Sequence, residues 1–269
     1  MADLYLSIEN WAAWIPPAFA KVIPSLSPAD SNKLEATSPN RISTLEPEIG
    51  FLVANRRRRL SPLSRVVIDT YHRANGNPTE GLHIPSVLCS TYGEHVRNTN
   101  LILDISANSD VSPTAFSLSV HNAVAGLISI FYDNEAPCLT MATNKSGVSV
   151  ALFEAYSMLK DSSHLSLTIY DGPVHESYRD AVPDSDDTAA ITMILSPASL
   201  KKDRLHIERI AAGSKTKARS PFLEIIEIVK FLQGGKDQAY SGCSDIEAEN
   251  GIILGDWIWS LLPTDPNAS

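Results

Sequence analysis

The chain has 269 residues and a formal net charge of −9, and 43% of its residues are hydrophobic. This amount of apolar material can bury a core for one large domain or two small ones. The acidic balance argues against nucleic acid as the main partner. No apolar run approaches the roughly 18 residues that span a bilayer, so we expect no membrane span.

The first part of the chain predicts one strand, one short helix and a long irregular segment. Residues 4–8 alternate weakly and are followed by Trp11 and Trp14, which we assign to a first strand and a short helix. Residues 16–48 are rich in proline, serine and asparagine and predict an irregular excursion. The compact basic block Arg56–Arg59 follows it.

In the middle of the chain, predicted helices and strands alternate. Ser61 suits the N-cap of a helix, and Pro62 suits its first position. The expected helices cover 60–71, 94–107, 119–132 and 146–160, and the expected strands cover 83–90, 137–143, 165–170 and 190–195. This order predicts an α/β layered domain with a mixed sheet and flanking helices.

The last third of the chain gives weaker signals. Residues 199–220 are basic and polar, and residues 222–232 form one amphipathic helix that ends at Gly234 and Gly235. A final strand at 251–254 precedes the pair of tryptophans Trp257 and Trp259.

The cysteines and the N-terminus indicate a cytoplasmic protein. Cys89, Cys138 and Cys243 share no metal-like spacing and leave one cysteine unpaired, so we expect buried, reduced thiols. The first residues have no basic flank before their apolar stretch, which argues against a secretory signal.

Two segments carry a resemblance to a known family. Residues 116–130 contain the core Asn122-x-x-Ala125-Gly126, and residues 137–148 form a strand, a tight turn and the start of a helix. Together they resemble the core of a β-ketoacyl synthase, in which the turn carries a cysteine. The sequence is most similar to the short family that covers only the N-terminal half of the thiolase fold. Its members are similar to the chain length factors of type II systems that make aryl polyenes.

The resemblance implies a thiolase-like fold in which residues 1–269 form a single β-ketoacyl-synthase-like domain. It is strongest over residues 60–195. Neither the excursion at 16–48 nor the C-terminal extension at 200–269 supports it, and the sequence leaves the role of that extension open.

Two departures from the family pattern imply that the chain does not condense acyl chains. Asn144 stands where the nucleophilic cysteine belongs, and an amide cannot replace an activated thiolate. The two histidines of the family's C-terminal half have no counterpart, since His206 is the only histidine after residue 200. The resemblance therefore implies an inactive homologue that needs no metal or organic cofactor.

The resemblance also implies partners. A chain-length-factor-like subunit would form a heterodimer with a full-length ketosynthase and shape its acyl tunnel, while an acyl carrier protein brings the chain on its phosphopantetheine arm. By resemblance, Thr114, Ala115 and Phe116 reach toward the partner, just before the interface helix that carries His121 and Asn122. The basic block Arg56, Arg57, Arg58 and Arg59 also suggests a partner. It either docks the acidic carrier protein or is a charge run exposed to solvent.

Two other function classes stay open. The chain could be a decarboxylase or hydrolase of acyl thioesters that uses Asn144, Ser146 or His121. Against this, Asn144 suits a strained turn, Ser146 suits a helix cap, and His121 suits a hydrogen-bonded histidine within a helix. The chain could also be a scaffold that docks the carrier protein and never contacts the acyl tunnel.

Overall fold

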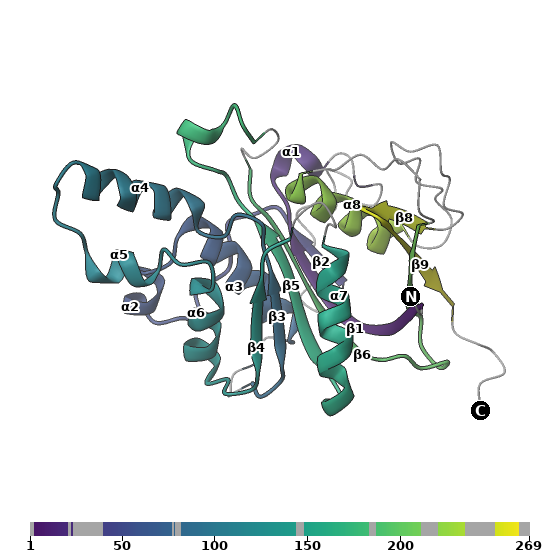
Figure 1. Ribbon diagram of the computed structural model, residues 1–269. Helices are drawn as coiled ribbons and strands as arrows, with labels where there is room; N and C mark the ends of the chain where they lie inside the picture. The colour runs from purple at the N-terminus through teal and green to yellow at the C-terminus, as the bar shows by residue number, and fades with distance from the viewer. Residues whose placement is uncertain are drawn as a thin grey trace.

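The computed structural model describes residues 3–20, 23, 40–76, 78, 82–143, 148–182, 187–210, 220–234 and 251–263. The strands are β1 (Leu4–Trp14), β2 (Asn40–Ser43), β3 (Ser86–Cys89), β4 (Cys138–Met141), β5 (Leu165–Asp171), β6 (Ala189–Pro197), β7 (Arg204–Arg209), β8 (Gly251–Leu254) and β9 (Trp257–Leu262). The α-helices are α1 (Pro17–Ala20), α2 (Ala54–Arg57), α3 (Pro62–Ala74), α4 (His95–Ser106), α5 (Pro113–Ser117), α6 (Ala123–Tyr132), α7 (Ser149–Met158) and α8 (Pro221–Gly234). Figure 1 shows the helices arranged around the sheet.

The strands form one mixed sheet in the order β4-β3-β5-β6-β1-β7-β9-β8, and β2 pairs in parallel with β1. The neighbours β4, β3 and β5 run parallel, whereas β6 is antiparallel to both β5 and β1. The carboxyl ends of β3, β4 and β5 therefore lie at the same end of the sheet. Ligand sites of open α/β sheets form at such ends.

Helices cover both faces of the sheet, which makes it the middle of three layers (Figure 1). Side chains alternate between the faces of a strand, and β3 illustrates this. Val87 lies in the core that α7 and α8 cover, whereas Leu88 lies in the core that α3 and α6 cover. The predicted layered α/β fold with a mixed sheet is confirmed.

The N-terminal strand is longer than predicted. Trp11 and Trp14, which we assigned to a short helix, belong to β1 and pair with Met193 and Ala190 of β6. The pairing with β6 on one side, and with β2 and β7 on the other, outweighs the weak local signal. The segment 16–48 also contains α1 and β2, while residues 24–39 lie outside the described part of the chain.

The start of α3 follows the prediction. Ser61 is its N-cap, and the Ser61 hydroxyl accepts a hydrogen bond of 3.0 Å from the backbone N–H of Ser64. Pro62 occupies the first helical position. A cap of this kind contributes about 1 kcal/mol to stability.

The helix predicted over residues 119–132 begins later than expected. The structure has the short helix α5, turns at 118–122 and then α6 from Ala123. His121 lies in these turns and not within a helix. Its Nε2 lies 2.8 Å from the carbonyl oxygen of Ser90, a contact between distant segments that the helical periodicity does not predict.

The C-terminal segment completes the sheet. Within the polar stretch 199–220, β7 pairs with the first residues of β1, and β9 and β8 follow it outward. Leu205 and Ile207 of β7 are fully buried between charged neighbours, a two-residue alternation typical of a strand. Trp257 and Trp259, for which we predicted no element, lie in β9.

Candidate functional site

The turn that defines the family resemblance lies between β4 and α7. Both flanking elements are where the sequence predicts them, but Asn144 and Ser146 fall in residues 144–147, outside the described part of the chain. The last described residue before the turn is Thr143, which is buried. Its hydroxyl lies 2.9 Å from that of Thr91, so the end of the segment that follows β4 contacts the loop after β3.

A buried carboxylate holds the loop after β3. Asp171, at the end of β5, is 3% exposed and accepts hydrogen bonds of 2.9–3.1 Å from the Ser90 hydroxyl and the backbone N–H groups of Thr91 and Tyr92. Burial raises the pKa of Asp171 to about 6, although these donors oppose the shift. The described contacts of Asp171 position the loop at 90–92.

Sequence reasoning missed this role of Asp171. The sequence feature that could have revealed this role is an aspartate that directly follows the apolar strand at 165–170, which is buried in the structure. Its donors lie about 80 positions earlier in the chain, so only the pairing of β3 with β5 brings them together.

His121 fixes the same loop from another side. Its Nε2 must donate to the Ser90 carbonyl, because a carbonyl oxygen only accepts. Its ring also packs on Gly93, where an added Cβ would lie 3.0 Å from His121 Cδ2. Gly93 has a φ of +54°, a conformation that strains other residues. The expectation that His121 is hydrogen-bonded is confirmed, whereas its placement in a helix is wrong.

The predicted partner-facing residues lie on α5. Ala115 lines a cavity of about 480 Å³, whereas Thr114 is exposed and Phe116 is 59% exposed. Asn122 is exposed at the start of α6. The cavity walls come from the start of α3, the residues that lead into α4, α4 as far as Asp104, residues 172–173 and Thr188, and they include the apolar side chains of Leu60, Leu63, Val96 and Leu101.

The main polar group of this cavity already has hydrogen-bond partners. Glu94 is 5% exposed and accepts hydrogen bonds of 2.6 Å from the hydroxyls of Ser61 and Ser64. Arg97 lies 3.7 Å from its second oxygen. A cavity of this kind fits an apolar chain better than a charged ligand, because its buried charge is paired and hydrogen-bonded.

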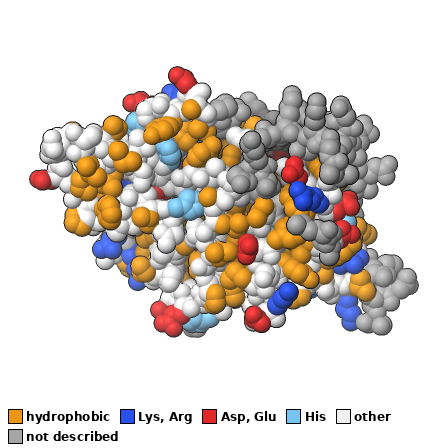
Figure 2. Space-filling view, in the orientation of Figure 1, with side chains coloured by type: hydrophobic (Ala, Val, Ile, Leu, Met, Phe, Trp, Pro, Cys, Tyr) orange, Lys and Arg blue, Asp and Glu red, His pale blue; other side chains and the backbone are white. Residues whose placement is uncertain are grey.

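The sheet has an open edge at β4, and apolar side chains are exposed on that strand and on nearby helices. β4 is one of the two terminal strands, so its outer side has no strand partner among the described strands. Cys138 of β4 is exposed, which corrects the expectation of three buried cysteines; Cys89 is buried, and Cys243 lies outside the described residues. Exposed apolar side chains on α4, α5, α6 and β4 are Val96, Ile102, Leu103, Ile105, Phe116, Ile130 and Leu139. Figure 2 shows apolar side chains gathered over the α4–α5 end.

The four arginines of the basic block have different surroundings. Arg57 and Arg58 line a second cavity, of about 880 Å³, between residues 47–51, α2 and α3. Arg56 lies over the ring of Phe131, 5.4 Å from its centre, and Arg59 is exposed. The block is therefore not one uniform docking surface.

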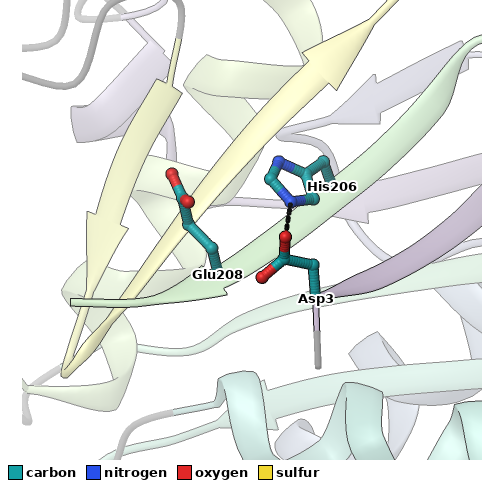
Figure 3. A group of neighbouring side chains, drawn as sticks. All are labelled: Asp3, His206 and Glu208. Atoms are coloured by element: carbon teal, nitrogen blue, oxygen red, sulfur yellow. Dashed lines mark ion pairs between the residues drawn. The ribbon is translucent and has the colours of Figure 1, made fainter. Parts of the chain in front are cut away.

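One group of described residues offers three metal-ligand atoms. These atoms, from Asp3, His206 and Glu208, lie within 4.8 Å of one another (Figure 3). His206 Nε2 lies 3.6 Å from Asp3 Oδ2, and the His206 ring stacks on Tyr5 at 4.5 Å. These contacts join the start of β1 to β7.

No helix in the described part of the chain combines the length and the apolarity that crossing a membrane requires.

Comparisons with known proteins agree with this architecture. The family model described as "Beta-ketoacyl synthase, N-terminal domain" matches residues 31–246, a wider range than residues 60–195. No curated protein matches the sequence.

Two solved structures are similar in fold. One is a ketosynthase in complex with its chain length factor from Xenorhabdus doucetiae, with 16% identity and a TM-score of 0.69 over 96% of this chain and 99% of that chain. The other is the ishigamide ketosynthase/chain length factor, with 14% identity and a TM-score of 0.56 over 78% of this chain and 69% of that chain.

Proposed function

Since the chain belongs to the family of β-ketoacyl synthase N-terminal domains, we propose that it is a non-catalytic, chain-length-factor-like subunit. In this proposal it forms a heterodimer with a full-length ketosynthase in the cytoplasm. It shapes the partner's acyl tunnel while a carrier-bound polyene, of the aryl polyene class, is extended. The fold shared with two ketosynthase/chain length factor structures supports this proposal.

The observation that carries the proposal is the open edge at β4 beside exposed apolar side chains. An unpaired edge strand offers a row of backbone donors and acceptors to another chain. Leu139 on β4, Ile130 on α6 and Phe116 on α5 are 37%, 65% and 59% exposed. Exposed apolar side chains, when they gather into a larger patch, mark protein–protein contacts. A ketosynthase that covers this face would satisfy both features.

The cavity beside α5 supports the proposed influence on chain length. Ala115 lines it, and Phe116 is the next residue on the same short helix. A change in side-chain volume at these positions would change the space open to a growing apolar chain. Each two-carbon unit added to the chain needs an equal volume of empty tunnel. Forcing extra atoms into a packed interior costs roughly 1–3 kcal/mol.

The absence of catalysis rests on the sequence. Asn144 cannot serve as the condensing nucleophile, so the cysteine must come from the partner. The alternative enzyme, a decarboxylase or hydrolase of acyl thioesters, would use Asn144, Ser146 or His121. No described contact favours it, because the Nε2–H of His121 is already bonded to the Ser90 carbonyl.

Docking of the carrier protein by Arg56–Arg59 is the least supported part of the proposal. Its support is the positive charge of the block in an acidic protein, since carrier proteins are acidic and charge complementarity steers association. The different surroundings of the four side chains limit this support to the exposed Arg58 and Arg59.

Co-expression with a full-length ketosynthase of the same host tests the proposal. We expect the two chains to co-purify as a stable heterodimer. We also expect that mass spectrometry of this chain alone, incubated with a malonyl- or acyl-loaded carrier protein, finds no covalent acylation. Failure to co-purify would contradict the proposed partner. Acylation or turnover that Asn144→Ala abolishes would favour the alternative enzyme.

A further inference from the structure

The second cavity has no part in the proposed tunnel. It measures about 880 Å³ and lies between residues 47–51, α2 and α3. The residues that line the two cavities do not overlap. Its walls include the loop residues Glu48 and Phe51 and, from the two helices, Arg57, Arg58, Arg65, Asp69, His72 and Arg73.

The cavity is positively charged although the protein is acidic. Four arginines and two carboxylates line it, which leaves an excess of two positive charges. Two of these groups neutralise each other at the floor, where Arg73 Nε and Nη2 donate hydrogen bonds of 2.9–3.2 Å to the Asp69 carboxylate. The remaining cations are Arg57, the last residue of α2, Arg58, which directly follows it, and Arg65 in the first turn of α3.

These three arginines have no acidic partner. Within the part of the chain that the structure describes, none of them forms an ion pair. Arg57 Nη1 and Arg65 Nη2 each make only a long hydrogen bond of 3.4 Å, to the carbonyl oxygens of Gly50 and Arg57. A guanidinium carries five N–H donors, so most donors of these side chains are unused.

The wall beside the arginines is aromatic. The ring of Phe51 stacks on that of His72, with 3.7 Å between centres and 10° between planes. Phe51 is 42% exposed. Nδ1 of His72 is buried and has no hydrogen-bond partner among the described residues. Burial, and to a lesser extent Arg73, lowers the pKa of His72 to about 4, so the ring is neutral at pH 7.

We propose that this cavity binds the phosphoryl group of an organic phosphate through Arg57, Arg58 and Arg65. Guanidinium groups match phosphate oxygens with paired hydrogen bonds. A phosphate monoester carries close to two negative charges at pH 7, which balances the excess charge of the cavity. The stacked rings of Phe51 and His72 offer apolar surface to the organic part of the ester. The site does not require the heterodimer, so phosphate binding is tested on this chain alone and can fail without touching the proposed ketosynthase partner.

Isothermal titration calorimetry tests this site with two probes, inorganic phosphate and free phosphopantetheine. We expect saturable binding of one equivalent, weakened at least tenfold by Arg65→Gln and by Arg58→Gln. Arg59→Gln is the matched control for these two small probes, because it removes the same charge from a neighbouring, exposed position that does not line the cavity. Its proposed contact is with the carrier protein, which is absent from this titration. We expect it to change the affinity less than twofold. Arg58 is exposed, so its variant tests the site even if Arg65→Gln fails to fold.

Two results would overturn the proposal. One is no saturable binding of either probe, and the other is an equal loss of affinity in Arg59→Gln and Arg58→Gln. The source of the phosphoryl group is distinguished with a carrier protein prepared with and without its phosphopantetheine arm. When a small probe binds, Arg58-dependent binding of the arm-bearing carrier, with none of the arm-free form, identifies the carrier as the source. Arg58-dependent binding of both small probes, with no difference between the carrier forms, supports the site with a free phosphate ester as ligand.

Discussion

The indole Nε1 of Trp259 donates a hydrogen bond of 2.8 Å to the hydroxyl of Ser149, 110 residues earlier in the chain. Both side chains are fully buried. The Ser149 hydroxyl in turn donates, at 3.4 Å, to the carbonyl oxygen of Leu254 on β8. This chain of contacts joins the last two strands to α7, the first element after residues 144–147. The C-terminal strands therefore hold the start of α7 in place.

We expect Trp259→Ala to lower the free energy of unfolding by about 3–5 kcal/mol, the usual cost of removing a large buried aromatic side chain. Trp259→Phe keeps most of the ring but leaves the Ser149 hydroxyl without its donor, so we expect a loss of about 1–2 kcal/mol. Urea unfolding followed by circular dichroism measures both. Leu200→Ala, at a 48% exposed position, is the control with an effect below about 0.5 kcal/mol. Equal losses in Trp259→Ala and Leu200→Ala would contradict the role of β9 in the core.

The buried Asp171 predicts a pH-dependent stability. Its pKa is about 6 in the folded protein against an ordinary value of 3.8. Between about pH 4 and pH 6 the folded state therefore holds a proton that the unfolded state has released. The stabilising contribution of Asp171 is fully present below pH 4 and is lost as the pH rises through 6.

Asp171→Asn removes this titration. We expect the difference in unfolding free energy between wild type and Asp171→Asn to shrink as the pH rises from 4 to 6, by up to about 3 kcal/mol. Urea unfolding at four pH values between 4 and 7 measures this difference. A difference that stays constant over this range would show that Asp171 does not titrate there.

The proposed partner face predicts that a charge introduced on β4 weakens the heterodimer. Leu139→Asp places a carboxylate on β4, where an interface would have to bury it unpaired. We expect the affinity for the ketosynthase to fall at least tenfold, with little change in the stability of this chain, since Leu139 is 37% exposed. Leu200→Asp, in the loop between β6 and β7, should leave the affinity unchanged. Analytical ultracentrifugation of the mixed chains compares the two variants, and equal affinities would remove β4 from the interface.

The cavity beside α5 predicts a change in product length. Within a reconstituted heterodimer, Ala115→Phe should fill part of the cavity and shift the products toward shorter chains, by about one two-carbon unit or more. Phe116→Ala should shift them toward longer chains if Phe116 limits the tunnel. Thr114→Val, exposed on the same helix and nearly unchanged in volume, is the control. Mass spectrometry of the released products measures the shift; unchanged products in both variants would favour a scaffold role.

The sequence predicted the middle of the fold well, because its elements have strong local signals. The run at 165–170 is buried along its whole length as β5, and Ser61 with Pro62 marks the start of α3. The weaker predictions failed where contacts with distant segments decide the structure. Trp11 and Trp14 lie in β1 because β6 pairs with them, and β7 forms in a polar stretch because β1 and β9 lie on either side of it.

The candidate site was predicted less completely for the same reason. Thr114, Ala115 and Phe116 were chosen by family resemblance, and a cavity does adjoin Ala115. The contacts of Asp171 with the loop at 90–92 join segments 79–81 positions apart, which no local pattern reveals. The block Arg56–Arg59 was visible in the sequence as a charge run. That its side chains lie in three different surroundings, a cavity, an aromatic ring and solvent, depends on how α2 packs beside α3.

The open edge at β4 has a consequence for how the protein is made in the cell. The backbone groups of an edge strand are chemically identical whichever chain they meet. A second copy of this chain can therefore compete for the same edge. Side chains such as Leu139 and Ile130 must then supply the specificity for one binding partner over another. Synthesis in excess over the proposed partner would leave this edge uncovered and favour self-association. In the proposed heterodimer, balanced production of the two chains keeps the edge covered.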